Sequence, residues 1–212
     1  MFYLPRHSVA QAWLTEARRI ETTSARFREL VRRLGALLAW EALREAPQRA
    51  CRVETPCGVA EGGVLAERVV IVPILRAGLI YGEGMAEVFP EAAFGHIGLY
   101  RDEQTHRPVP YFTKLPAWLG QGGEPVRVLL ADPMLATGHS AVAAADELLK
   151  RGVKAREMML LTMVSAPEGR AVFEAAHPEI ALWTWALDER LNERAYIVPG
   201  LGDAGDRLFG TV

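Results

Sequence analysis

Short hydrophobic runs recur along this chain, and longer stretches with a helical pattern separate them. Residues 68–75 form a continuous, largely β-branched run, which is typical of a strand buried on both faces. Further strands are expected at 93–99, 126–131, 158–165 and 181–187. Strands that alternate with helices predict an α/β fold with a central parallel sheet, in which ligands bind at the carboxyl ends of the strands.

Helices are expected before and between these strands. The first 50 residues have a helical character, and Thr23 or Ser24 can cap a helix whose apolar residues follow the 3.6-residue period. Another helix follows the strand at 126–131 and ends at Gly152, and Pro167 can begin a third. These helices are expected to cover the sheet.

Three segments lack a helix or strand pattern. Residues 52–67 are polar and contain glycine, and no element is assigned to them. Residues 100–112 are polar, carry two prolines and are flanked by aromatic residues, which predicts an exposed hairpin arm that can act as a lid. The glycine-rich tail at 196–212 predicts a shaped loop without regular elements or a long disordered tail, and its interleaved aromatic and apolar residues favour the loop.

The composition is that of a globular protein, with 50% hydrophobic and 24% charged residues. No apolar run is long enough to span a bilayer and the N-terminus does not resemble a signal peptide, so no membrane association and a cytoplasmic location are expected. The net charge of −2 argues against nucleic acid as a partner. Cys51 and Cys57 are expected to be free thiols, and the scattered histidines show no metal-ligand spacing.

The segment DPMLATGHS at 132–140, the phosphate loop, carries the clearest candidate chemistry. It lies between an expected strand and an expected helix, so the backbone N–H groups of 137–140 can bind an anion at the helix N-terminus. Gly138 permits close approach, and Thr137 and Ser140 add hydroxyl donors. The loop itself has neither the Walker A lysine nor a G-x-G-x-x-G pattern, so it fits one monophosphate. The alternative is an ordinary turn in which Ser or Thr caps the helix.

Three charged residues accompany this loop. Asp132 lies at a strand end, where its carboxylate can accept hydrogen bonds from sugar hydroxyls. Arg76 directly follows a buried strand, and Arg101 begins the expected arm. Two arginines near a phosphate site would suit a second, more highly charged group such as diphosphate. Each could instead form an ordinary surface salt bridge.

Five segments together resemble the signature set of the uracil phosphoribosyltransferase family. They are IVPILRAG (71–78), GLYRDEQTHRPVPYF (98–112), DPMLATGHS (132–140), APEG (166–169) and YIVPGLGDAGDRLFGT (196–211). The resemblance implies a type I phosphoribosyltransferase fold, with a central parallel sheet flanked by helices. It also implies one domain over 1–212, which comprises an N-terminal helical segment at about 8–50, a β-hairpin arm at about 100–112 and a hood at about 190–212.

By this resemblance the enzyme would convert uracil and 5-phospho-α-D-ribose 1-diphosphate (PRPP) to UMP and diphosphate in pyrimidine salvage. The implied catalytic residues are Arg76, Arg101 and Asp132. PRPP would contact these three residues and also Pro133, Met134, Leu135, Ala136, Thr137, Gly138, His139, Ser140 and Asp203. Uracil would contact Tyr196, Ile197, Gly202, Asp203 and Ala204. Magnesium would arrive bound to PRPP without direct protein ligands, and a homodimer or homotetramer with GTP as a possible allosteric effector is implied.

Two positions in the phosphate loop depart from related enzymes. Pro133 follows Asp132, which leaves one carboxylate for the ribose diol where many phosphoribosyltransferases have two. His139 stands where the uracil enzymes usually have glycine; its backbone N–H remains available, and its ring is expected to face solvent rather than the phosphate.

Two other functions compete with this interpretation: a phosphoribosyltransferase for purine or orotate, and a PRPP-sensing RNA-binding regulator. The tail argues against the first and the net charge against the second.

Overall fold

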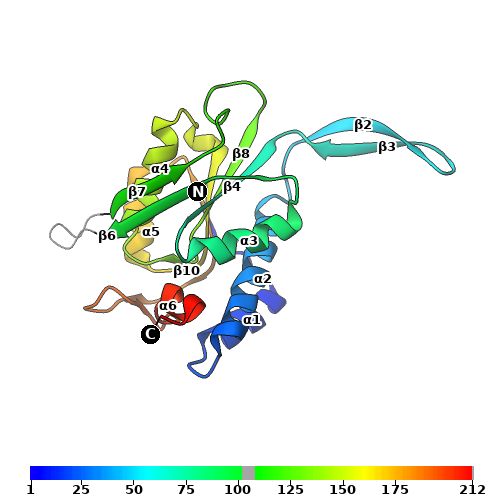
Figure 1. Ribbon diagram of the computed structural model, residues 1–212. Helices are drawn as coiled ribbons and strands as arrows, with labels where there is room; N and C mark the ends of the chain where they lie inside the picture. Colours follow the sequence, from blue (N-terminus) through cyan, green and yellow to red (C-terminus); the bar gives the residue numbers. More distant parts are fainter. Residues whose placement is uncertain (102–107, 212) are drawn as a thin grey trace.

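The computed structural model describes residues 1–101 and 108–211, without the side chain of Arg101. A mostly parallel sheet runs through the centre of the molecule in the order β1-β11-β10-β8-β4-β6-β7 (Figure 1). These strands are β1 (Phe2–Tyr3), β4 (Arg68–Leu75), β6 (His96–Arg101), β7 (Pro108–Lys114), β8 (Val126–Ala131), β10 (Met158–Ser165) and β11 (Ala181–Leu187). Only β7 pairs antiparallel in this order, so the expected α/β class with a parallel sheet is confirmed.

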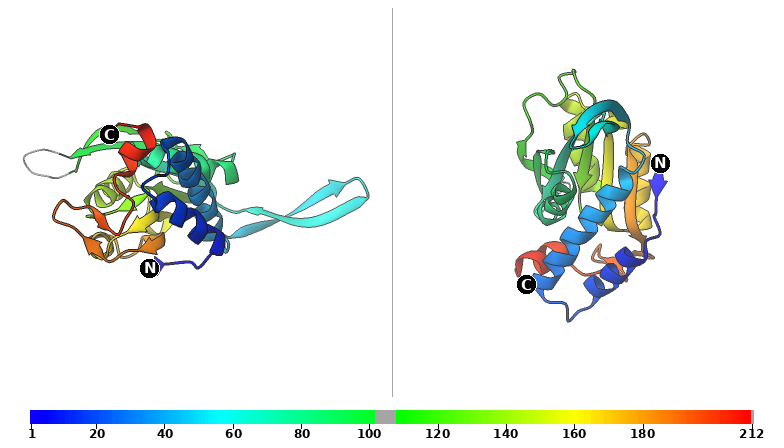
Figure 2. Two further views of the ribbon diagram at one scale, coloured as in Figure 1. Left: turned by 90° about the horizontal axis from the view of Figure 1, so that it is seen from below. Right: turned by 90° about the vertical axis from the view of Figure 1, so that its right-hand side faces the viewer.

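Helices cover both faces of the sheet. On one side are α1 (Ser8–Arg18), α2 (Ser24–Ala42) and α3 (Gly78–Val88), and on the other are α4 (His139–Lys150) and α5 (Pro167–Ala176) (Figures 1 and 2). Ile71 of β4 belongs to the core beneath α2, whereas its neighbours Val70 and Val72 belong to the core beneath α4. Burial on both faces explains why β4 is a continuous apolar run in the sequence.

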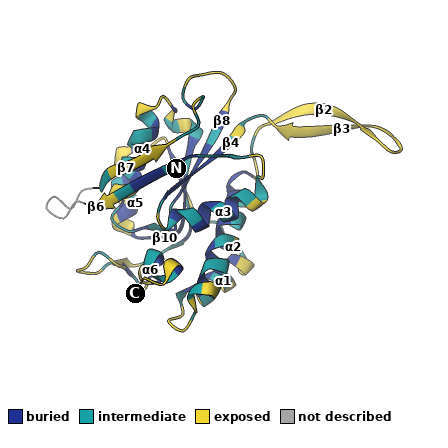
Figure 3. Cartoon of the chain, viewed as in Figure 1, coloured by how far each residue is buried: buried dark blue, intermediate teal, exposed yellow. Residues whose placement is uncertain are grey.

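The segment after α2 departs from the expectation of an irregular polar stretch. Strands β2 (Gln48–Thr55) and β3 (Gly58–Leu65) form an antiparallel hairpin that projects far from the body (Figures 1 and 3). Every residue of β3 is exposed. Because neither face of this hairpin is covered by the chain itself, no apolar alternation marks it in the sequence. The N-terminal helical segment correspondingly ends at Ala42 and not near residue 50.

The arm expected at 100–112 is also an antiparallel pair. β6 pairs with β7 from His96 opposite Lys114 to Arg101 opposite Pro108, with an irregularity between Gly98 and Leu99. The proposed lid tip at 102–107 lies outside the described residues. The strand expected at 93–99 is divided into β5 (Ala93–Phe94) and the start of β6.

The C-terminal segment from residue 190 contains regular elements, two of which lie in the tail that was expected to have none. β12 (Arg190–Leu191) pairs with β13 (Ile197–Val198), and α6 (Ala204–Phe209) follows; these three elements make up the hood. The Asp203 side chain accepts a hydrogen bond from Asp206 N at 2.9 Å and so caps α6, and Gly210 ends it with φ 66°. Glycine therefore ends this helix rather than preventing it. No helix within residues 1–101 and 108–211 is long and apolar enough to cross a membrane.

Candidate active site

The phosphate loop connects β8 to α4 and is not wholly irregular. Met134 and Leu135 form the short strand β9, which pairs with Val164 and Ser165 at the end of β10. The carbonyl of Pro133 accepts hydrogen bonds from Met163 N and Val164 N at 2.9 and 3.1 Å. The first half of the loop is thus held as an extension of the sheet.

The second half of the loop turns into α4 at a glycine. Gly138 is the N-cap residue, with φ 83°, a left-handed conformation that is costly for residues with a side chain. A Cβ at Gly138 would lie 2.6 Å from the carbonyl oxygen of Gly169, near the start of α5. Gly169 in turn leaves no room for a Cβ beside the carbonyl oxygen of Ala136. These two glycines let the loop lie directly on α5, and the start of α4 borders the pocket.

Asp132 begins the phosphate loop at the carboxyl end of β8. Its carboxylate accepts a hydrogen bond from Met134 N at 3.3 Å, and its own N–H donates to Leu161 O at 3.2 Å. Burial raises the pKa of Asp132 from 3.8 to about 7, although the Met134 N–H acts in the opposite direction. The carboxyl group is therefore close to half ionised at neutral pH.

The turn after β4 lies beside this loop. A Cβ at Gly78, the first residue of α3, would collide with the carbonyl oxygen of Ala131, so glycine permits α3 to begin against the end of β8. Arg76 precedes it, with its side chain 59% exposed. Its guanidinium is 3.9 Å from the Asp206 carboxylate and 5.6 Å from the centre of the Phe209 ring. Arg76 therefore reaches across to α6 through weak contacts that a ligand could replace.

The hood provides the opposite wall of the site. Between β12 and β13, the Asn192 carboxamide oxygen accepts hydrogen bonds from Arg194 N and Tyr196 N at 3.0 and 2.9 Å. Ala195 in this turn has φ 61°, which is uncommon for a residue with a side chain. The hood is tied to α5 because Glu168 accepts a hydrogen bond from Leu191 N at 2.9 Å, which lowers the pKa of Glu168.

One pocket of about 370 Å³ joins these segments. Its lining residues come from the phosphate loop (Met134, Ala136, Thr137, His139 and Ser140), from the hood turn (Arg194, Ala195 and Tyr196), from the start of α6 and the residues before it (Gly202, Asp203, Ala204 and Gly205), and from Ala77 and Pro108. A helix N-terminus that can bind an anion thus faces a glycine-rich wall across a cavity of ligand size.

A comparison with protein families gives a match over nearly the whole chain. The model of the uracil phosphoribosyltransferase family matches residues 4–211. The chain belongs to this family. A uracil phosphoribosyltransferase from Dictyoglomus thermophilum is 47% identical over 206 residues, which cover 97% of each chain. One from Lactococcus lactis subsp. cremoris is 47% identical over 211 residues, which cover 99% of this chain and 98% of the relative.

Solved structures support the fold of this uracil phosphoribosyltransferase family member. A protein from Aquifex aeolicus superposes with a TM-score of 0.90 at 35% identity, covering 99% of this chain and 98% of its own. An APRTase from Giardia lamblia matches with a TM-score of 0.51 at 17% identity over 84% of each chain, which is a likeness of fold alone. The type I phosphoribosyltransferase fold is therefore confirmed.

The pocket lining includes nine of the residues that the sequence singled out: Met134, Ala136, Thr137, His139, Ser140, Tyr196, Gly202, Asp203 and Ala204. Arg76, Asp132 and Gly138 belong to the turns beside the pocket but do not line it. Leu135 is buried in the core, and Ile197 is 3% exposed, so neither side chain lines the pocket. Pro133 is also buried. Contacts of these residues with a ligand would have to use the backbone. The Arg101 side chain lies outside the described residues, and its role stays a prediction.

Five residues that line the pocket were missed from the sequence: Ala77, Pro108, Arg194, Ala195 and Gly205. Ala77, Pro108 and Gly205 lie within motifs that were recognised, and Arg194 and Ala195 directly precede one, so their place in or beside a motif was the only signal available. His139 is the first residue of α4, is exposed and lines the pocket. That its ring faces solvent rather than a bound phosphate stays a prediction.

Proposed function

We propose that this chain transfers the 5-phosphoribosyl group of PRPP to N1 of uracil, giving UMP and diphosphate in pyrimidine salvage. The observation that supports this most directly is the pocket between the phosphate loop and the glycine-rich hood. Its two walls suit the two ends of UMP, a phosphate and a base. The names of the relatives agree with this activity.

The 5′-phosphate of PRPP would bind at the start of α4. The N–H groups of residues 137–140 and the helix dipole favour an anion there, and the Thr137 and Ser140 side chains border the same pocket. The close packing of Gly138 on α5 supports this assignment, since it fixes the loop before a ligand arrives.

The ribose and diphosphate would lie between Asp132 and Arg76. An ionised Asp132 can accept hydrogen bonds from both ribose hydroxyls. Arg76 would stabilise the negative charge that develops on the departing diphosphate, with Arg101 as a second expected contact. Magnesium commonly keeps several waters and binds substrate phosphates, so an ion that enters with PRPP would be held mainly by the substrate, with the Asp203 carboxylate at the border of the same pocket. That ion would add positive charge at the leaving group.

Uracil would bind against the hood. Its ring edge presents two carbonyl acceptors and N–H donors, which the backbone groups of 202–204 can match without charged side chains. Gly202 leaves the nearest atom at 3.7 Å from where a Cβ would lie, so the base has room to approach the backbone. Rigid backbone donors and acceptors discriminate a carbonyl from an amino group, and hence uracil from cytosine.

An assay of PRPP-dependent conversion tests this function. Purified enzyme with Mg²⁺ and PRPP should convert uracil to UMP, and cytosine, orotate and hypoxanthine should react far more slowly. A preference for orotate or hypoxanthine would show that the proposed base assignment is wrong. Repeating the assay with GTP tests the allosteric activation that the family resemblance suggests.

A homo-oligomer is the expected assembly, and the β2–β3 hairpin is the proposed contact. An isolated two-stranded hairpin is marginally stable in water, yet this one is exposed on both faces. Its exposed apolar residues include Val53, Val59 and Val64. Replacing residues 50–63 with a short turn should lower the mass measured by analytical ultracentrifugation to that of a monomer. An unchanged mass would assign the interface to another surface.

A further inference from the structure

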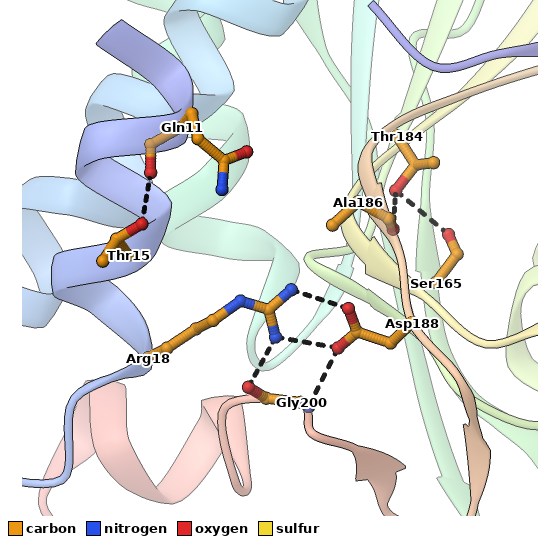
Figure 4. A network of polar contacts seen from close by, with 8 residues as sticks. All are labelled: Gln11, Thr15, Arg18, Ser165, Thr184, Ala186, Asp188 and Gly200. Carbon is orange, nitrogen blue, oxygen red and sulfur yellow. Dashed lines mark hydrogen bonds and ion pairs between the residues drawn. The ribbon is translucent and has the colours of Figure 1, made fainter. Parts of the chain in front are cut away.

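An arginine from the N-terminal helical segment reaches the hood. Arg18, the last residue of α1, donates two hydrogen bonds to Asp188, which directly follows β11 (Figure 4). Its Nη1 is 2.8 Å from Asp188 Oδ2, and its Nη2 is 2.7 Å from Asp188 Oδ1. This is the bidentate arrangement that fixes the relative orientation of both side chains.

The same pair holds both backbone polar groups of Gly200. Arg18 Nη1 donates to the Gly200 carbonyl oxygen at 2.7 Å, and Gly200 N donates to Asp188 Oδ2 at 2.8 Å (Figure 4). Gly200 is buried, has φ 59°, and leaves no room for a Cβ beside the carbonyl oxygen of Ile197. The chain reversal after β13 is thus held by side chains from outside the hood, Arg18 of α1 and Asp188 after β11.

A second arginine reinforces this attachment at the next residue. Arg207 of α6 donates to Leu201 O and to Ala17 O, both at 2.7 Å, and to Arg19 O at 2.8 Å. The end of α1 is therefore linked to two consecutive residues immediately before the pocket residue Gly202: directly to Gly200, and through Arg207 to Leu201.

The sheet supplies the fixed end of the arrangement. Asp188 N donates to Ser165 O at 2.8 Å, where Ser165 is the last residue of β10. The Ser165 hydroxyl in turn donates to Thr184 Oγ1 at 3.2 Å, within the buried edge between β10 and β11 (Figure 4). The Asp188 side chain is only 6% exposed, so its charge depends on Arg18 for compensation.

We infer that Arg18 and Asp188 are positioning residues for the base, which hold the backbone of residues 200–204 at the distance that uracil binding requires. This inference rests on the proposed binding of uracil to the hood. Neither side chain lines the pocket, so each acts through Gly200. Backbone recognition tolerates little displacement, because a shift of about 1 Å can cost up to 100-fold in rate.

Steady-state kinetics of the full-length enzyme test this inference. Arg18→Ala should raise KM for uracil by roughly 10- to 100-fold while KM for PRPP changes by less than about threefold, since the phosphate loop is attached separately. Arg18→Lys keeps the charge and the fold but cannot donate in a fork, so KM for uracil should lie between those of wild type and Arg18→Ala. A uracil KM within about twofold of wild type for both variants would overturn the inference.

Arg26→Ala is a matched control. Arg26 of α2 also makes a bidentate pair with a carboxylate of α1, Glu16, at 2.7 and 2.8 Å, but within residues 1–101 and 108–211 it makes no hydrogen bond or ion pair with the hood. The KM of Arg26→Ala for uracil should equal that of wild type. A rise as large as that of Arg18→Ala would mean that any loosening of α1 impairs uracil binding, which overturns the positioning role.

Hydrogen exchange of wild-type enzyme separates this inference from the proposed base site. UMP should protect residues 197–204. A lack of protection would refute the base site itself, whereas protection together with an unchanged uracil KM in Arg18→Ala would refute only the positioning role.

Discussion

The raised pKa of Asp132 predicts that its ionised carboxylate destabilises the folded enzyme when no ligand is bound. Burial raises this pKa from 3.8 to about 7 in the folded chain, whereas an unfolded chain has the ordinary value. Because the folded pKa is raised, the folded state binds the proton more tightly. The contribution of Asp132 to the free energy of unfolding is therefore fully present below pH 3.8, and it is lost progressively as the pH rises toward 7.

The size of the effect follows from the shift. A shift of about 3 units at 1.36 kcal/mol per unit corresponds to about 4 kcal/mol. Part of Asp132 is accessible to solvent, which makes this figure an upper limit. Asp132→Asn removes the charge with little change of shape, so it should stabilise the ligand-free enzyme by up to about 4 kcal/mol at pH 8 and by less than half of that at pH 5.

Urea unfolding of both proteins between pH 5 and pH 8 measures this difference. Glu193→Gln is the control, because Glu193 is exposed in the hood turn and its replacement should change the free energy of unfolding by less than about 0.5 kcal/mol. The same Asp132→Asn variant should lose at least about tenfold in kcat/KM for PRPP, since a charge-assisted contact contributes about 1.5–3 kcal/mol. A stability difference that does not change with pH would refute the reasoning, because burial of the charge would not be its cause.

Three further predictions follow from single contacts. Arg76→Ala should lower kcat/KM for PRPP by well over tenfold, whereas Arg68→Ala at the opposite end of β4 should leave it unchanged. Steady-state kinetics measure both, and the same kcat/KM in the two variants would contradict the leaving-group role of Arg76. Ala195→Gly should raise the free energy of unfolding by about 1 kcal/mol, because glycine adopts the left-handed backbone conformation of residue 195 without strain. Chemical denaturation measures this change, and a lower free energy of unfolding would contradict the argument. Gly138→Ala should abolish the rise in Tm that PRPP causes in wild type, because a Cβ meets Gly169 O at 2.6 Å; a retained thermal shift would mean that the 5′-phosphate binds elsewhere.

The elements that the sequence predicted well are those whose burial is local and periodic. The strands β4, β8, β10 and β11 have the expected bounds, because burial on both faces leaves an uninterrupted apolar run. The phosphate loop was recognised for a similar reason, since its glycine and hydroxyl residues are adjacent in the chain. The β2–β3 hairpin was missed because it buries neither face, and α6 because a single capping residue, Asp203, outweighs its glycine-rich surroundings.

By itself the sequence determined the α/β class, the phosphate loop and the family resemblance, since these depend on residues that are close together in the chain. Only the tertiary structure decided which distant residues support the site. Arg18 and Asp188 are 170 positions apart, and each alone has the sequence signature of an ordinary surface charge. Their meeting at Gly200 depends on where α1 lies against the end of β11, which is a property of the topology and not of any local pattern.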